Sequence, residues 1–204
     1  TVREITMDAY VYEKKSVTIV EIMGRTSGWL TAASALARKY DGDNPLLIYL
    51  PEVDFEENHF LAQIEEALEE HMNVVVCVSE GIHDKNGTFI CEYDTTVGTD
   101  IFGNKMLAGC GKYLENLVKE CLNVKARSIE LNVNQRCSVA MTSHTDQQEA
   151  IMAGRYGLRV ALEKGITGKM ITFVRCSDDP YVVACGLESV DDVCNKERHV
   201  PLEW

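Results

Sequence analysis

Apolar residues recur along this chain in short runs, each about the length of a β-strand. The runs VTIVEI (17–22), LLIYL (46–50) and VVVCV (74–78) are nearly continuous, as in strands that are covered on both faces of a sheet. The runs MITFV (170–174) and YVVAC (181–185) flank the sequence Ser-Asp-Asp-Pro, whose residues favour a tight turn. The last two runs are therefore predicted to form a hairpin.

Amphipathic helical patterns lie between these runs. Apolar residues follow a spacing near 3.6 in four segments, residues 27–40, 58–71, 104–123 and 143–164. Asn58 is the predicted N-cap of the second segment, and Ser143 and Asp146 have the spacing of a capping box in the fourth. The alternation of strands and helices predicts an α/β fold, a three-layer, Rossmann-like parallel sheet followed by a C-terminal hairpin.

The composition narrows the classes of partner. The 204 residues carry a formal net charge of −12, whereas binding to a nucleic-acid backbone needs clustered Lys and Arg, so we expect no nucleic-acid partner. Every apolar run is shorter than the ~18 residues that cross a bilayer. The N-terminal sequence TVREITMDAYVYEKK has no signal-peptide core, so we also expect no membrane partner.

The eight cysteines favour free thiols over a metal site. None belongs to a C-x-x-C pair, and several lie inside apolar runs such as VVVCVSEG and YVVACG. A zinc site would need closely spaced ligands with His nearby. We therefore expect buried free thiols, no metal site in this chain, and a cytoplasmic location.

Polar residues follow the first three strands. Met23-Gly24-Arg25 follows the first, Pro51-Glu52 the second and Ser79-Glu80-Gly81 the third. Ligands bind at the carboxyl ends of strands in open parallel sheets, so these three segments are expected to line one crevice. Gly24 would let the backbone approach a ligand, and Arg25 would add a cation at a helix start. The alternative is a glycine-assisted turn with an exposed arginine, since neither a G-x-G-x-x-G nor a Walker-type loop is present.

Glu80 and the pair Arg127 and Arg136 each have two possible interpretations. Glu80 could accept hydrogen bonds from sugar hydroxyls or be a surface glutamate, whereas Glu52 is expected to buttress the sheet edge. Arg127 and Arg136 bracket a predicted strand and suit a phosphate dianion, but surface arginines are equally common. His144 is expected to be structural.

Together, these segments resemble the phosphofructokinase family. V-T-I-V-E-I-M-G-R-T-S-G-W-L is similar to the strand and turn of that family that end in M-G-R and hold fructose 6-phosphate. L-P-E, V-S-E-G, R-S-I-E-L-N and N-Q-R follow in the family's order. D-I-F-G-N (100–104), E-L-N-V-N-Q-R-C and V-P-L-E-W resemble the bacterial pyrophosphate-dependent members, and the resemblance covers essentially the whole chain.

The resemblance implies a role for each matching residue. Met23, Gly24 and Arg25 would contact the sugar phosphate and the reacting end, with Arg25 also a possible stabiliser of the transition state. Glu80 would hold sugar hydroxyls. Arg127 would reach the 6-phosphate from a neighbouring subunit of a homodimer or homotetramer, beside Arg136. The implied reaction is glycolytic transfer of a phosphoryl group to the 1-hydroxyl of fructose 6-phosphate.

Two positions depart from the family pattern. An arginine expected before the M-G-R strand is replaced by Lys14 and Lys15, and a histidine between the late arginines is replaced by Val133. Asn132 or Asn134 could substitute for that histidine as a ligand of the 6-phosphate.

The family's donor-phosphate loop and T-I-D-N-D segment have no counterpart in this sequence, since 22 residues precede Met23. We therefore expect residues 1–204 to be the fructose 6-phosphate-binding portion of a longer enzyme, inactive alone. Pyrophosphate or ATP, with Mg²⁺ on its phosphates, would bind the other portion. The alternatives to a pyrophosphate enzyme are an ATP-dependent phosphofructokinase and a non-catalytic sugar-phosphate-binding domain.

Overall fold

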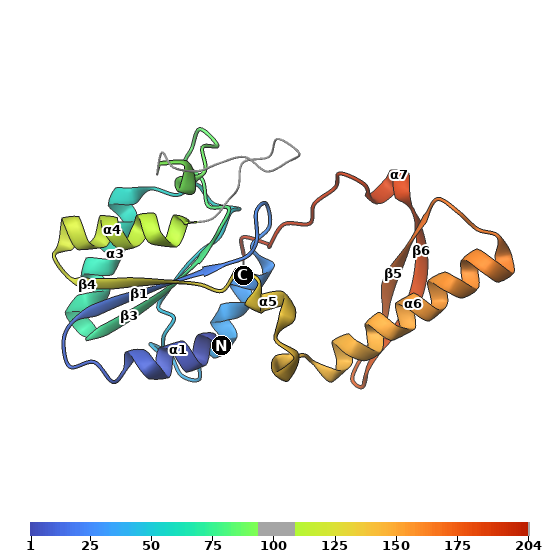
Figure 1. The fold of residues 1–204 in the computed structure, drawn as a ribbon, viewed down its shortest axis with the longest axis horizontal. Helices are drawn as coiled ribbons and strands as arrows, with labels where there is room; N and C mark the ends of the chain where they lie inside the picture. Colours follow the sequence, from blue (N-terminus) through green and yellow to red (C-terminus); the bar gives the residue numbers. More distant parts are fainter. Residues whose placement is uncertain (94–108, 204) are drawn as a thin grey trace. The chain divides into compact units, whose positions relative to one another are not determined.

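The chain forms two compact units in this computed structural model, which describes residues 1–93 and 109–203. The first, here called the sheet unit, contains residues 1–136 and 198–204, and the second, the hairpin unit, contains residues 137–197. The sheet unit holds a parallel sheet whose strands, in spatial order, are β2 (Leu47–Tyr49), β3 (Asn73–Ser79), β1 (Ser16–Ile22) and β4 (Lys125–Glu130) (Figure 1). The predicted α/β class with a parallel sheet is confirmed.

The two central strands are buried along their whole length. Every residue of β1 and of β3 is buried, and the strands pair in parallel from Ser16 with Asn73 to Ile22 with Ser79. Because both faces of the sheet are covered, neither strand needs an alternating polar face. This explains why the sequence shows continuous apolar runs here.

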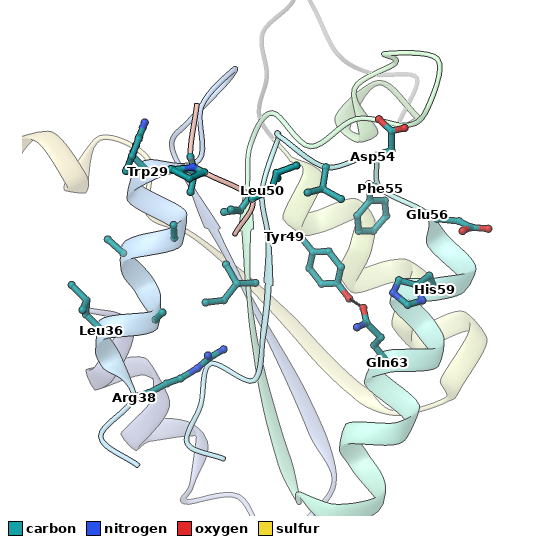
Figure 2. Close-up of a pocket in the computed structure, with 18 residues that line it drawn as sticks. Trp29, Leu36, Arg38, Tyr49, Leu50, Asp54, Phe55, Glu56, His59 and Gln63 are labelled. Atoms are coloured by element: carbon teal, nitrogen blue, oxygen red, sulfur yellow. Dashed lines mark hydrogen bonds between the residues drawn. The ribbon is translucent and has the colours of Figure 1, made fainter. Parts of the chain in front are cut away.

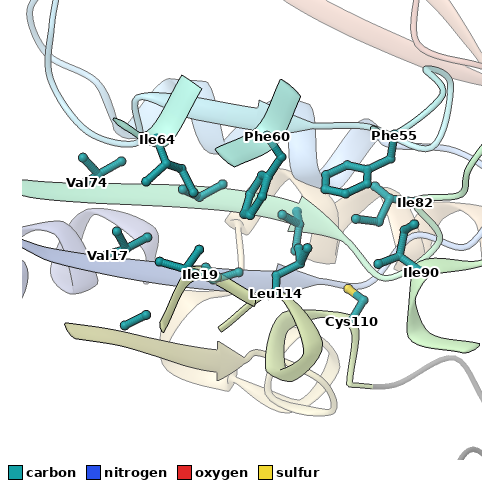
Figure 3. Close-up of a cluster of buried hydrophobic side chains, with 14 of the residues drawn as sticks. Val17, Ile19, Phe55, Phe60, Ile64, Val74, Ile82, Ile90, Cys110 and Leu114 are labelled. Atoms are coloured by element: carbon teal, nitrogen blue, oxygen red, sulfur yellow. The ribbon is translucent and has the colours of Figure 1, made fainter. Parts of the chain in front are cut away.

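Helices cover both faces of this sheet. Helices α3 (Glu57–Glu70) and α4 (Cys110–Leu122) lie on one face, and α1 (Val2–Ala9) lies on the other (Figure 1). Figure 3 shows Phe60 and Ile64 of α3 packed with Leu114 of α4 over the side chains of β1 and β3. The three layers of the predicted architecture are therefore present in the sheet unit.

The first predicted helix, residues 27–40, is shorter than expected. It consists of α2 (Trp29–Ala32) continued by a 3-10 helix, η1 (Ala33–Ala37). Arg38 is extended, and its guanidinium donates to the carbonyl oxygens of Pro45 and Leu46 at 2.7 and 3.3 Å. These contacts fasten the chain to the segment before β2, so the helix ends one turn early.

Two helix starts also differ from expectation. The prediction of Asn58 as N-cap is wrong, because α3 begins at Glu57 after an extended Glu56, which places Asn58 in the first turn. Helix α4 begins at Cys110; the earlier part of the predicted helix, and D-I-F-G-N (100–104), lie outside the described residues. Helix α1 was not predicted, since its short sequence mixes charged and apolar residues.

The hairpin unit contains the predicted helix and hairpin. In α6 (His144–Lys164) the Ser143 hydroxyl accepts the backbone N–H of Asp146 at 3.4 Å, as predicted for the cap. Strands β5 (Lys169–Asp178) and β6 (Tyr181–Ser189) pair antiparallel and are followed by α7 (Val190–Val193). The short helix α5 (Asn134–Cys137) spans the boundary between the two units, and the 3-10 turn η3 (Val139–Met141) follows it before α6. A further 3-10 turn, η2 (Ile90–Tyr93), belongs to the sheet unit.

Candidate functional site

The segments that follow β1 and β3 meet at the carboxyl edge of the sheet. We call residues Met23–Gly28 the MGR loop. The backbone N–H of Gly24 donates to Oε1 of Glu80 at 3.2 Å, and the Ser79 hydroxyl donates to the carbonyl oxygen of Gly24. The sequence prediction that the two segments converge at one sheet edge is confirmed.

Glycine is required where these two segments cross. A Cβ atom at Gly81 would lie 1.7 Å from the carbonyl oxygen of Arg25, which no side chain could tolerate. A Cβ atom at Gly24 would lie 2.7 Å from the carbonyl oxygen of Ser27, and the φ angle there is +156°. The backbones of the two segments therefore lie in direct contact, and a side chain at Gly24 or Gly81 would force them apart.

The loop after β4 joins the same edge. Gln135 accepts the backbone N–H of Met23 on its Oε1 atom at 2.7 Å, which fastens the β4 loop to the MGR loop. Arg136 follows Gln135 directly, and both Arg136 and Arg25 are exposed. The structure thus gathers Met23, Gly24, Arg25 and Glu80, and Arg136 is adjacent in sequence to Gln135, which contacts Met23. Exposed guanidinium groups and an acceptor carboxylate can together bind a phosphorylated sugar.

Arg127 lies away from this edge, inside β4 and in register with Thr18 of β1. Its guanidinium donates to the Thr18 hydroxyl at 3.1 Å, to the Tyr12 hydroxyl at 3.0 Å and to Asp8 at 2.6 Å. These partners belong to the α1 side of the sheet. Within one chain Arg127 is therefore not brought to the candidate site, and its role towards a neighbouring subunit stays a prediction.

The residues at the two departures from the family pattern are also placed apart. Lys14 and Lys15 are exposed and precede β1, so they lie at the amino end of the strand whose carboxyl end bears the MGR loop. Asn132, Val133 and Asn134 belong to the β4 loop, and all three are exposed. The two asparagines are thus on the candidate-site side of the sheet, and the two lysines are not.

Glu52 has the structural role that was expected. Its Oε1 atom accepts the backbone N–H of Gly28 and that of Val200, each at 2.9 Å. The carboxylate thereby fastens the loop after β2 to the MGR loop and to the C-terminal segment. His144 is exposed at the start of α6 in the hairpin unit.

Comparison with known proteins identifies the family. A family model described as "Phosphofructokinase" matches residues 1–161. The chain belongs to the phosphofructokinase family. It is 34% identical over 188 residues to the pyrophosphate–fructose 6-phosphate 1-phosphotransferase of Halomonas elongata, an alignment of 92% of this chain and 44% of the relative. The Methylococcus capsulatus protein of the same name is 34% identical over 206 residues, covering 100% of this chain and 48% of the relative.

A solved structure gives the same result for the fold. The pyrophosphate-dependent phosphofructokinase of Marinobacter aquaeolei superposes with a TM-score of 0.81 at 27% identity, over 99% of this chain and 46% of that chain. The sequence therefore spans about half the length of each of these three relatives.

Sequence reasoning missed Glu21, a buried acid of this phosphofructokinase chain. The Glu21 carboxylate lies in β1 and accepts the backbone N–H of Gly111, at the start of α4, at 2.7 Å. Burial raises the pKa of Glu21 above its usual value, although the hydrogen bond from Gly111 acts to lower it. The available signal was a single charged residue inside the apolar run VTIVEI.

The cysteines are all free thiols, but only part of the burial prediction is correct. Three are buried: Cys77, Cys91 and Cys110. Burial raises the pKa of the Cys77 thiol to about 11, so it stays protonated near neutral pH. Cys185 is half-buried. The prediction is wrong for four exposed thiols, which lie on α4, on α5, on β5 and in the turn after α7: Cys121, Cys137, Cys176 and Cys194.

A separate cavity of about 800 Å³ lies beside the edge strand β2 (Figure 2). Its walls come from the α2–η1 segment, from α3 and from the C-terminal residues Val200, Pro201 and Leu202. The Tyr49 hydroxyl donates to Gln63 at 2.7 Å on one wall. Because the walls are mainly apolar and exclude Gly24, Arg25 and Glu80, this cavity suits a sugar phosphate less well than the polar edge does.

Residues 1–93 and 109–203 bring together no group of three or more His, Cys, Asp or Glu side chains that could hold a metal ion. In the same residues, no helix combines the length and the apolar character needed to cross a bilayer.

Proposed function

We propose that this chain is the fructose 6-phosphate-binding part of a pyrophosphate-dependent phosphofructokinase. The observation that carries the proposal is the convergence of the MGR loop with Glu80 at one edge of the sheet. The printed names of the relatives, including those of Halomonas elongata and Methylococcus capsulatus, supply the choice of substrate and donor. The proposed cytoplasmic location, glycolytic role and oligomeric assembly follow from the same family.

The chemistry of the edge suits a phosphorylated ketose. The phosphate dianion would be held by guanidinium groups, for which Arg25 and Arg136 are the exposed candidates. Glu80 uses Oε1 to hold Gly24, and its Oε2 atom would accept a sugar hydroxyl. Both ends of the sugar would then be fixed relative to the glycine backbone.

The proposed reaction needs positioning and charge stabilisation more than covalent chemistry. The 1-hydroxyl of the sugar would attack the terminal phosphorus of pyrophosphate, its proton would pass to an aspartate of the donor-binding portion, and orthophosphate would depart. Arg25 would offset negative charge on the transferred group. Mg²⁺ would enter with the phosphates of the donor.

A neighbouring subunit would complete the phosphate site through Arg127. Because its guanidinium also bonds Asp8, Tyr12 and Thr18, substitution is expected to lower stability as well as affinity. The proposal requires Arg127→Ala to weaken binding by more than its loss of folded protein explains. Equal losses would contradict this role.

Calorimetric titration with fructose 6-phosphate tests the proposed function. We expect the 204-residue chain to bind the sugar phosphate and the Arg25→Ala variant to bind it at least about tenfold more weakly, a loss of ~1.4 kcal/mol. Arg155→Ala, at an exposed arginine of α6, is the matched control and should bind normally. Absence of binding by the wild-type chain, or equal losses in both variants, would refute the proposal.

A kinetic assay tests the expectation that the chain is inactive alone. Purified protein with fructose 6-phosphate, pyrophosphate and Mg²⁺ should show no fructose 1,6-bisphosphate formation. Turnover by the purified chain would show that it contains a donor site that the family resemblance places elsewhere.

A further inference from the structure

The polypeptide crosses between the two units twice, and both crossings adjoin the MGR loop. The chain passes from the sheet unit to the hairpin unit between Arg136 and Cys137 and returns between Glu197 and Arg198. The residue before the first crossing is hydrogen-bonded to the loop, since Gln135 accepts the backbone N–H of Met23 at 2.7 Å. All of these contacting groups belong to the sheet unit.

The return segment is bonded to the other end of the same loop. The carbonyl oxygen of Arg198 accepts hydrogen bonds from the Ser27 hydroxyl at 2.9 Å and from the indole N–H of Trp29 at 2.6 Å. Two residues later, Val200 donates its N–H to Glu52, and the same carboxylate oxygen holds the N–H of Gly28. The MGR loop is therefore fastened to both crossings, one at each end.

These contacts are not imposed by the pairing of the strands. Each of them uses a side chain, and the partners are 112 residues apart for Met23 and Gln135 and 171 residues apart for Ser27 and Arg198. A parallel sheet fixes the register of its backbone and leaves such side-chain contacts free to be present or absent. Their presence at both crossings is a feature of this loop.

The Glu52 carboxylate has an arrangement that suits a fastening role. One oxygen accepts both N–H groups, while the other, Oε2, is buried without a hydrogen-bond partner among the described residues. Placing a carboxylate there has a desolvation cost that the two bonds offset. A side chain that only filled space would not need this charge.

We propose that Gln135 and Glu52 are positioning residues that couple ligand binding at the MGR loop to the two connections with the hairpin unit. The ligand is that of the proposed function, on which this inference rests. A bound sugar phosphate restricts the loop, and the loop restricts residues 131–137 through Gln135 and residues 198–200 through Glu52. By linkage, ordering of these connections strengthens ligand binding in return.

Hydrogen exchange on the 204-residue chain, with and without fructose 6-phosphate, tests the coupling. In the wild type we expect the ligand to slow amide exchange in the MGR loop and also in residues 131–137 and 198–200. Gln135→Met should lose the ligand-dependent slowing at 131–137 and keep it at 198–200. Glu52→Ala should keep the slowing at 131–137 and lose it at Val200, because Arg198 stays bonded to Ser27 and Trp29. Glu52→Gln, which retains an acceptor oxygen, should behave like the wild type.

The control is Gln147→Met, at an exposed glutamine of α6, which should leave the slowing unchanged in both connections. Thermal unfolding of each variant, measured alongside, separates loss of coupling from loss of folding. A merely structural role predicts that each variant raises exchange everywhere in proportion to its lost stability. Ligand-dependent slowing that survives at 131–137 in Gln135→Met would overturn the inference.

Failure of the proposed function gives a different result. If the wild type shows no ligand-dependent slowing anywhere, the proposed ligand is wrong, and the ligand-free samples decide the coupling. There, Gln135→Met should exchange several-fold faster at Met23 and at residues 131–137 but not at 198–200. If slowing occurs in the MGR loop alone, the ligand is right and the coupling is wrong.

Discussion

The two units bury apolar residues to very different degrees, although their strand sequences look alike. All residues of β1 and of β3 are buried, while none of the residues of β5 or β6 is. Val160 is the one buried apolar residue among the described residues of the hairpin unit. An apolar run therefore indicates a strand, but the layers packed on that strand determine its burial. The sheet unit is stabilised by a shared core, and the hairpin unit mainly by its strand ladder and α6.

The largest expected effect is the loss of a core aromatic ring from the sheet unit. Phe60 is 0% exposed and packs between α3 and the sheet, whereas Phe173 of the hairpin is 49% exposed. Phe60→Ala should lower the free energy of unfolding by about 3–5 kcal/mol, and Phe173→Ala by about 1 kcal/mol or less. Urea unfolding of both variants measures this, and equal losses would remove the contrast between the units.

The next effect concerns a glycine of the candidate site. Gly81→Ala places a methyl group against the Arg25 carbonyl and should cost about 1–3 kcal/mol of stability. It should also displace the MGR loop and abolish measurable binding of fructose 6-phosphate. Gly154→Ala is the control, because nothing lies within 4 Å of the added atom in α6, and it should stabilise by about 0.5–1 kcal/mol. Normal binding by Gly81→Ala would show that the close approach of Gly81 to the Arg25 carbonyl does not shape the site.

A buried ion pair of the sheet unit should outweigh an exposed one of the hairpin unit. The Glu115 side chain is 7% exposed and bonds Lys112, Lys119 and Ser128, whereas Asp178, paired with Arg175, is 85% exposed. Glu115→Gln should cost about 1–2 kcal/mol at neutral pH, and Asp178→Asn less than about 0.5 kcal/mol. Equal losses of unfolding free energy for the two variants, measured in urea, would show that burial does not decide the strength of these ion pairs.

The contribution of Glu115 to the free energy of unfolding should depend on pH in a defined direction. Burial raises the pKa of Glu115, but the hydrogen bonds from Lys112, Lys119 and Ser128 prevail and lower it to about 2. Its stabilisation is thus complete above the usual pKa of about 4.5 and is lost as pH falls through about 2. The difference in unfolding free energy between the wild type and Glu115→Gln should narrow over that interval, and a constant difference would contradict it.

The smallest expected effect is the pH dependence of stability at Glu21, which runs in the opposite direction to that at Glu115. Because burial raises its pKa in the folded state, the contribution of Glu21 to stability is largest below about pH 4.5 and falls as pH rises through the raised pKa. Glu21→Gln retains an acceptor for Gly111 and should remove this fall. Parallel stability curves for the two proteins between pH 4 and 8 would contradict the assignment.

The sequence was sufficient for those features that depend on local pattern. The continuous runs of β1 and β3 predicted buried parallel strands, and the residues after them predicted the edge where Gly24 and Glu80 meet. Capping chemistry predicted Ser143 but failed at Asn58, because the buried stripe of Phe60, Ile64 and Leu68 sets where α3 packs.

Features that depend on distant contacts were not predictable. Nothing near Gln135 or Glu52 in the sequence indicates that they hold opposite ends of one loop, since their partners are 112 and 24 residues away. The division into two units likewise depends on contacts between residues that are distant in the sequence. The chain leaves and rejoins the sheet unit without a linker of distinctive composition, so only the packing shows the boundary.

The most direct test of this account is a crystal structure of the chain grown with fructose 6-phosphate. We predict density for the sugar phosphate beside Gly24 and Glu80, with its phosphate within hydrogen-bond distance of Arg25 or Arg136. Ligand density in the apolar cavity beside β2, with the carboxyl edge of the sheet unchanged, would contradict the account.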